Sequence, residues 1–284
     1  MKKLIVFLLA ILVVVVVAIL FTSCEEQAGV YKPKKKIFKV YKQYGADPEY
    51  LVEEWKWNGK RLSSITYYYK GEFLAEEEFI YEGNKIVKII DDNGLYAEYI
   101  YADKQFKKIN FFDSDDILRS EITFQYKGKK ISTITIYGYN VCKNVISMIE
   151  RSFMGKLLSE KGMKIVAEKL ANQSKDTFVF YLSYDGENLT SISGDGYDAT
   201  IYSDYDTHSN IWYNFYPFTY YHSNFYNVFS KNNPGKETVY YGESFDSIIY
   251  NYTYDGDSPG TIQKNYFNES GELIHTERTR IEYN

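Results

Sequence analysis

The chain has 284 residues and a formal net charge of −5, from 33 Lys and Arg against 38 Asp and Glu. This mildly acidic balance argues against nucleic acid as a partner, because the phosphate backbone selects basic surfaces. Tyrosine is abundant, at 31 residues, and it suits strands and surfaces that are apolar on one side and wet on the other. The composition therefore favours a β-rich protein.

The N-terminal segment indicates where the protein is located in the cell. Basic Met1–Lys3 precedes an uninterrupted apolar run, Leu4–Phe21. Such a run is either a transmembrane anchor or the core of a cleaved secretory signal. The stretch that ends in Thr22-Ser23-Cys24 resembles a bacterial lipoprotein signal, although Phe21 stands where leucine is usual. The resemblance implies that residues 1–23 are removed and that Cys24 becomes the lipidated N-terminus.

The residues after Cys24 extend this interpretation. Glu25-Glu26 resembles the acidic export signal of Bacteroidetes surface lipoproteins. The resemblance implies that Cys24 enters outer-membrane lipid at the cell surface, with the periplasmic face as the alternative. Residues 24–36 are interpreted as a tether whose lysines could touch anionic headgroups, although a solvated linker is the simpler interpretation. Cys142 would then have no cysteine partner, so no disulfide is expected.

One hairpin frame repeats between Glu53 and Tyr137. An aromatic anchor has an aromatic residue two positions before it, a turn residue two after, an apolar residue five after and isoleucine eight after. The anchors are Trp57, Tyr81, Tyr101 and Tyr126; the earlier aromatics are Trp55, Phe79, Tyr99 and Phe124; the turn residues are Gly59, Gly83, Asp103 and Gly128; the apolar positions are Leu62, Ile86, Phe106 and Ile131; and the isoleucines are Ile65, Ile89, Ile109 and Ile134. The frame returns around Tyr184 and Tyr254, so one supersecondary unit recurs along the chain.

The turn predicts a register for each hairpin. Asn58-Gly59 suits a two-residue loop with positive φ angles. That loop places Trp57 opposite Lys60 and Trp55 opposite Leu62. By the same parity Ile65 points to the other face. Either a bulge resets the register, or both faces carry apolar cover.

The rest of the domain follows in order. Ile37–Tyr44 is expected to form a first strand, and second turns at 70–71, 92–94 and 114–116 link the repeats into an antiparallel meander. Residues 141–172 show apolar positions at helical spacing, Val145, Ile149, Phe153 and Leu157, and predict a short helical insertion packed on the sheet. Residues 37–284 are therefore expected to form a single mainly β domain.

An aromatic segment, residues 205–229, interrupts the strand pattern. Irregular segments on a rigid β scaffold often carry binding groups. The candidate ligand contacts are Trp212, Tyr213, Tyr216, Tyr220 and Tyr221. The competing interpretation is that these rings fill the core.

The repeat resembles the tyrosine-aspartate (YD, RHS-type) hairpin repeat. Together Cys24, the glycine-turn units and Ser230–Pro234 resemble a Bacteroidales lipoprotein family of unknown function, which implies a porin-like β fold and brings no known substrate or catalytic residue. Charged residues such as Lys56, Lys88 and Lys108 lie among the strand aromatics, whereas a lipid-facing strand carries an apolar band. We therefore expect a soluble barrel or strongly curved sheet, tethered by lipid.

Motifs for catalysis are not visible in the sequence. It has no glycine-rich phosphate loop after a strand, no Cys or His cluster at metal spacing and no nucleophile elbow. We predict no cofactor, metal or catalytic residue. The favoured function is a noncatalytic surface protein that binds a neutral glycan or a peptide; an envelope scaffold and a glycan-processing enzyme are the alternatives. No oligomeric state is predicted.

Overall fold

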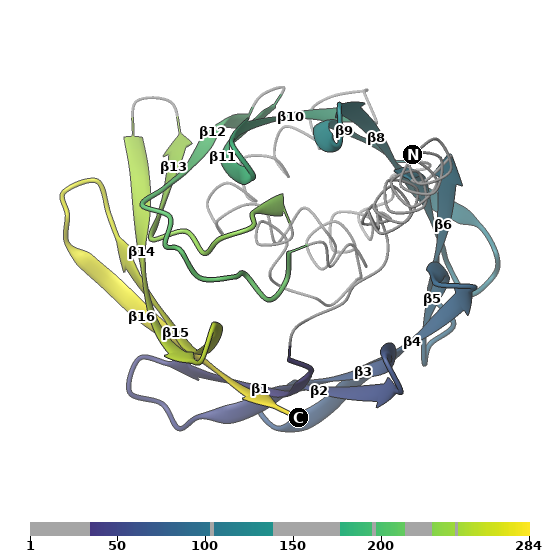
Figure 1. Ribbon diagram of the computed structural model, residues 1–284, viewed down its shortest axis with the longest axis horizontal. Coiled ribbons are helices and arrows are strands. Elements are labelled where there is room, and N and C mark those ends of the chain that lie inside the picture. The colour runs from purple at the N-terminus through teal and green to yellow at the C-terminus, as the bar shows by residue number, and fades with distance from the viewer. Residues whose placement is uncertain (1–34, 103–104, 139–176, 195–196, 214–228, 242–243) are drawn as a thin grey trace, which may run out of the picture.

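The computed structural model describes residues 35–102, 105–138, 177–194, 197–213, 229–241 and 244–284. The signal peptide, Cys24, the helical insertion 141–172 and the aromatics Tyr216, Tyr220 and Tyr221 lie outside these residues. The described residues form one closed antiparallel barrel (Figure 1), with neighbours in sequence order. The predicted meander is thus confirmed, in its barrel form.

The strands follow one another around the ring in chain order. They are β1 (Ile37–Tyr44), β2 (Tyr50–Asn58), β3 (Arg61–Tyr69), β4 (Glu72–Glu82), β5 (Lys85–Asp91), β6 (Tyr96–Ala102), β7 (Gln105–Phe112), β8 (Leu118–Lys127), β9 (Lys130–Gly138), β10 (Thr177–Asp185), β11 (Asn188–Gly194), β12 (Tyr197–Ser203), β13 (Lys236–Tyr241), β14 (Ser244–Asp255), β15 (Ser258–Phe267) and β16 (Leu273–Tyr283). β1 closes the ring by pairing with both β2 and β16.

The hairpin register differs from the prediction. Trp57 lies opposite Leu62, not Lys60, and Trp55 lies opposite Ile65, not Leu62. In the turn between β2 and β3, only Gly59 has a positive φ, of 57°. Asn58 pairs with Arg61, so the two loop residues are Gly59 and Lys60. The loop therefore begins one residue later than the sequence suggests.

A bulge resets the register in each unit, which is the first of the two alternatives. The pairing shifts between Lys56 and Trp57, so Ser63 is the additional residue on β3. The same shift occurs in the hairpins β4–β5, β6–β7, β8–β9, β10–β11 and β14–β15. Because the bulge changes the parity of the strand, Leu62 and Ile65 both turn inward, and both are buried.

The anchors hold successive hairpins together and explain why tyrosine is preferred. The Tyr81 hydroxyl donates to the Leu62 carbonyl at 2.9 Å, and the Tyr101 hydroxyl donates to the Ile86 carbonyl at 2.8 Å. Tyr283 repeats the bond to the Pro259 carbonyl at 2.7 Å. In each case the acceptor lies five residues after the previous anchor. A phenylalanine would fill the same space but leave the carbonyl without this donor.

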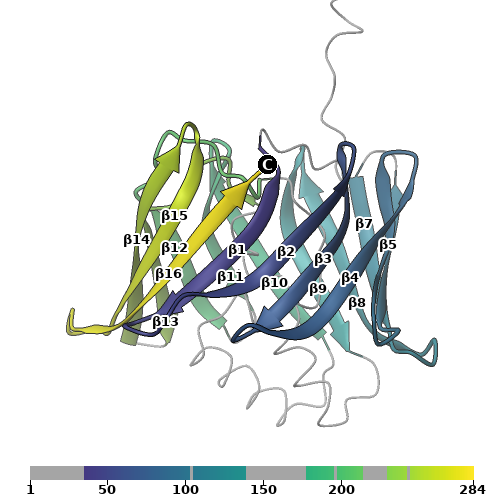
Figure 2. The same ribbon diagram turned by 90° about the horizontal axis from the view of Figure 1, so that it is seen from below.

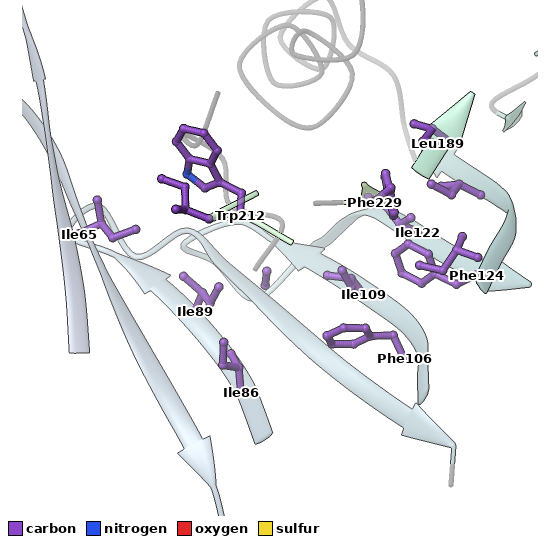
Figure 3. Close-up of a cluster of buried hydrophobic side chains, with 14 of the residues drawn as sticks. Ile65, Ile86, Ile89, Phe106, Ile109, Ile122, Phe124, Leu189, Trp212 and Phe229 are labelled. Atoms are coloured by element: carbon purple, nitrogen blue, oxygen red, sulfur yellow. The ribbon is translucent and has the colours of Figure 1, made fainter. Parts of the chain in front are cut away.

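The inner face of the wall is apolar over much of its height. Trp55, Ile65 and Phe106 are among the fully buried side chains. Figure 3 shows Trp212 and Phe229, which come from outside the strands, together with Ile65, Ile89 and Ile109 from the wall. Burial of one such side chain stabilises the fold by about 1.5–3 kcal/mol, so this cluster is a main source of stability.

The outer face carries charged side chains. Lys56 projects outward between Trp55 and Trp57 and pairs with Glu76 at 2.9 Å. Lys108–Glu121, at 2.6 Å, and Lys39–Glu54, at 3.6 Å, occupy the same face elsewhere on the barrel. Exposed apolar side chains such as Ile80, Ile100 and Ile201 also belong to the strands of this wall. In the part of the chain that is described, no helix has the length and apolarity needed to cross a membrane.

Candidate ligand pocket

The barrel has two ends of different construction (Figure 2). One end, which we call the tether rim, carries the glycine hairpin turns, the start of β1 and the end of β16; Ile37 pairs there with Tyr283. Its turns are residues 58–61, 82–85, 127–130, 185–188 and 255–258. The other end, the pocket rim, carries the linking turns at residues 45–49, 70–71, 92–95, 113–117 and 268–272.

Two segments enter the barrel from the tether rim. Residues 204–213 follow β12 and residues 229–235 precede β13, and both lie inside the ring in Figure 1. Asp206 accepts hydrogen bonds from Asn233 and Tyr254, and the Asn210 amide donates to the Ser230 carbonyl at 2.8 Å. These bonds satisfy the polar backbone of irregular segments in a buried place. The segments therefore form part of the interior.

The predicted ligand contacts are placed as follows. Trp212 is 1% exposed and belongs to the apolar cluster. Tyr213 is half-buried beside it, and Tyr216, Tyr220 and Tyr221 are outside the described residues. A ligand cannot stack on the Trp212 ring in this arrangement, because protein atoms cover it. The structure brings Trp212 to the core and leaves the binding role of the rest of the segment a prediction.

A pocket of about 510 Å³ opens at the pocket rim. Its volume lies within the range of small-ligand sites. The lining residues come from β1 to β4 and their turns: Lys42, Tyr44, Asp47, Tyr50, Val52, Glu53, Tyr67, Tyr68, Tyr69, Lys70 and Leu74. The wall is thus rich in tyrosine, with a few charged groups of both signs.

The base of the pocket is fixed by a buried ionic cluster. Lys42 on β1 lies 3.3 Å from the Glu277 carboxylate, and Lys264 on β15 lies 3.9 Å from the same oxygen. Burial opposes ionisation of Glu277, but Lys42 and Lys264 outweigh it and hold its pKa at about 2. Burial likewise disfavours the charged Lys42, and Glu277 more than compensates by raising the Lys42 pKa. The Lys42 chain is therefore held in place as a cation.

Hydrogen bonds also orient the polar wall. The Trp55 indole donates to Glu53 at 2.9 Å, and the Tyr67 hydroxyl donates to Glu77 at 2.8 Å. Burial and the neighbouring Tyr44 raise the pKa of Tyr50 to about 12, so its hydroxyl stays protonated at neutral pH. A protonated phenol can donate a hydrogen bond to a carbonyl oxygen of a ligand.

The rim beside the pocket is apolar. Tyr69, Phe73 and Leu74 are 62%, 57% and 50% exposed, and Leu273 and Ile274 are 53% and 58% exposed. The first three come from β3 and β4, and the other two from β16, on the other side of β1 and β2 in the barrel order. Exposed apolar side chains that lie close together, as Tyr69, Phe73 and Leu74 do in the sequence, can mark a contact surface.

The linking turns of the pocket rim also carry acidic residues. Asp47, Glu49, Glu72, Asp92, Asp113, Asp115, Asp116, Glu269 and Glu272 all belong to the linking turns or their edges. Some of them stabilise their own turn. Asp113 accepts the backbone N–H of Ile117 at 2.9 Å and a bond from Arg119, and its pKa is lowered, first by that backbone bond. Within the described ranges, no three His, Cys, Asp or Glu side chains are grouped to hold a metal ion.

The sequence does not predict this pocket. Its residues lie at the ends of strands, where linking turns of unequal length decide which side chain points inward. The run Tyr67-Tyr68-Tyr69 was the available signal, because three successive tyrosines place rings on both faces of a strand end.

Comparison with known proteins supports the fold. No family model matches the chain, and no curated protein matches it. A porin-like protein from Bacteroides uniformis is similar in structure, with a TM-score of 0.53 and 12% sequence identity over 87% of this chain and 98% of that chain. A porin-like protein from Bacteroides vulgatus has a TM-score of 0.47 and 13% identity, over 88% and 99% of the two chains. At such identity the first likeness shows a shared barrel fold.

Proposed function

We propose that this protein is a noncatalytic binding protein of the cell envelope that holds a peptide segment at the pocket rim. One observation carries the proposal: a pocket of about 510 Å³ is lined by the exposed side chains of Tyr69 and Leu74, and exposed Phe73 lies next to Leu74 on β4. A pocket that accepts one side chain, next to a surface that accepts its neighbours, is the usual form of a peptide site.

The chemistry of the rim favours peptide over glycan. Sugar rings stack on flat aromatic faces, but Leu74, Leu273 and Ile274 offer branched aliphatic surface. Tyrosine and aliphatic side chains together suit the apolar and aromatic side chains of a peptide. The acidic linking turns would repel an acidic sequence, so the peptide is expected to be apolar with neutral or basic flanks.

The envelope location rests on the N-terminus. The apolar run Leu4–Phe21 and the lipoprotein-like stretch before Cys24 support export and lipid attachment, and a porin-like fold is in keeping with that compartment. Replacement Cys24→Ala is expected to leave an uncleaved precursor. Mass spectrometry of a mature protein that ends at another residue and carries no acyl chain would refute the lipid anchor.

A binding screen tests the proposed ligand. Calorimetry with the purified protein should detect apolar peptides with neutral or basic flanks, and weaker or no binding of acidic peptides. Tyr69→Ala should raise Kd about tenfold, because an interface anchor commonly contributes more than about 1 kcal/mol. Tyr181→Ala is the matched control, since Tyr181 is also half exposed, at 50%, but lies on β10.

Other ligands and two further variants separate the alternatives. If neutral oligosaccharides bind and no peptide does, the peptide proposal fails and a glycan-binding protein replaces it. An envelope scaffold would use the apolar rim without the pocket. In that case Ile274→Ala would weaken binding of the partner while Tyr50→Ala, inside the pocket, would not.

A further inference from the structure

The tether rim is divided by charge. The half formed by β1 to β9 carries Lys36, Lys60, Arg61, Lys85, Lys127, Lys129 and Lys130, with Glu82 as its acidic residue in the described turns. The half formed by β10 to β16 carries Asp185, Glu187, Asp255 and Asp257. A chain of net charge −5 thus gathers basic residues on one half of one end.

The two halves also differ in the partners of their charged side chains. On the acidic half Lys231 pairs with Glu187, Lys35 pairs with Asp255, and Ser209 donates to Asp257 at 2.9 Å. On the basic half Lys36 donates to the Gly59 carbonyl at 2.5 Å and Arg61 donates to the Asn84 side chain at 3.2 Å. Both acceptors are neutral, so these two side chains keep their full charge for a partner.

The hairpins fix where the cations point. Lys60, Lys127 and Lys129 are exposed at the tips of their turns. Behind them Arg61 lies over the Tyr81 ring at 5.6 Å and Lys85 over the Tyr101 ring at 4.8 Å. The ring contacts keep the long side chains along the rim. The basic half is therefore a prearranged row of positive charge along the tether rim.

The N-terminal anchor, on which this inference rests as part of the proposed function, would bring a membrane to this end. The apolar run ends at Phe21, and Lys35, the first described residue, pairs with Asp255 in a turn of the tether rim. The intervening residues 22–34 can span at most about 45 Å when fully extended. This holds whether the run stays in a bilayer or Cys24 carries a lipid. A surface tethered this closely meets the headgroups at a high effective concentration.

We propose that the basic half of the tether rim docks on the anionic phospholipid headgroups of the membrane that holds the N-terminus. The docked rim orients the barrel with its pocket rim away from the bilayer. The acidic turns of the pocket rim favour the same orientation, because they are repelled by an anionic surface. The attraction is expected to weaken with salt, since it acts within a Debye length of about 8 Å at physiological ionic strength.

Lysine acetylation in nanodiscs tests the proposal on the full chain. The protein is held by its own N-terminus in discs of phosphatidylcholine, with or without phosphatidylglycerol, and acetylation rates are read by mass spectrometry. Lys60, Lys127 and Lys129 should react several-fold more slowly on the discs that contain phosphatidylglycerol, and high salt should remove the difference. Lys70, exposed on the pocket rim, is the internal control and should react equally on both.

Two results would overturn the proposal. Equal protection on both kinds of disc would show that proximity alone covers the rim, and protection of Lys70 instead would show the opposite orientation. A variant with Lys60→Glu, Lys127→Glu and Lys129→Glu gives an independent check. It should lose the lipid-dependent protection of Lys36 and Lys85 while keeping the wild-type melting temperature, whereas Lys70→Glu should change neither.

Discussion

The two ends of this barrel come from one repeated hairpin but have opposite characters. At the tether rim the glycine turns are short and alike, the rim is charged, and residues 204–213 and 229–235 fill the interior. At the pocket rim the turns vary, the rim is apolar and acidic, and a pocket of about 510 Å³ remains open. A regular meander thus provides the frame, and the segments that depart from the repeat give the two ends their different characters.

The largest effect is expected where the closed end is filled. Trp212→Ala should lower the free energy of unfolding by about 3–5 kcal/mol, because the indole is 1% exposed and its loss leaves a cavity. Tyr69→Ala on the open rim should change it by less than about 0.5 kcal/mol, since that ring is 62% exposed. Urea unfolding of both variants measures the contrast. Equal losses would contradict the division into a closed and an open end.

The next largest loss of stability is expected in the ionic cluster of Lys42, Lys264 and Glu277. Glu277→Gln leaves Lys42 and Lys264 without their shared carboxylate and should cost about 3–5 kcal/mol at neutral pH. In the wild type the contribution of this group is fully present above the unfolded pKa of about 4.5 and is lost as pH falls toward about 2. The variant should lose less stability across that pH range than the wild type. Acid titrations of the wild type and Glu277→Gln, followed by circular dichroism, measure this difference. An equal loss of stability in the two proteins would contradict the prediction.

The sequence predicts the hairpin meander well because each repeat carries the local signals for its own strands and turn. Alternating aromatics make a strand, a glycine with positive φ makes a turn, and Ile65 at a constant offset marks the paired strand. A bulge is one of two alternatives that the sequence leaves open, because packing on the inner face decides a register shift of one residue; the structure places the bulge at Ser63. Only the closed ring shows that both Leu62 and Ile65 must turn inward.

The candidate site is not predictable in the same way. The pocket draws Lys42, Tyr50 and Tyr67 from three strands and rests on Glu277, which is distant in the sequence. Their proximity depends on closure between β1 and β16, which no local pattern specifies. Conversely, the sequence suggests Trp212 as a binding residue because strand periodicity fails around it. Loss of periodicity marks an irregular segment, and such a segment can enter the core as readily as remain on the surface.

A smaller effect is expected at the regular turns of the tether rim. Gly83 has a φ of 58°, and a Cβ there would meet no atom within 4 Å. Gly83→Val should therefore cost about 1–2 kcal/mol through backbone conformation alone. Gly260 is the matched control: its φ is not positive and a Cβ would make ordinary contacts at 3.7 Å, so Gly260→Ala should be nearly neutral. Thermal unfolding of the pair checks the difference; a tolerated Gly83→Val would contradict the role of the turn.

The smallest effect concerns a second buried carboxyl group, which contrasts with Glu277. Burial raises the pKa of Glu237, and the Tyr250 hydroxyl donates to it at 2.6 Å and partly offsets the rise. A raised folded pKa means that the folded state binds this proton more tightly than the unfolded state. The associated stability is therefore fully present below the unfolded pKa and is lost as pH rises through the folded pKa.

Glu237→Gln isolates this contribution. The amide keeps an oxygen that accepts the Tyr250 hydroxyl bond but has no charge to desolvate. The variant should match the wild type in acid and be slightly more stable at neutral and higher pH, which is the reverse of Glu277→Gln. Tyr250→Phe is the companion control, because it removes the donor and should raise the Glu237 pKa further. Urea unfolding of these variants across pH measures the effect, and a Glu237→Gln protein that is less stable than the wild type at neutral pH would mean that the carboxylate is ionised and paired.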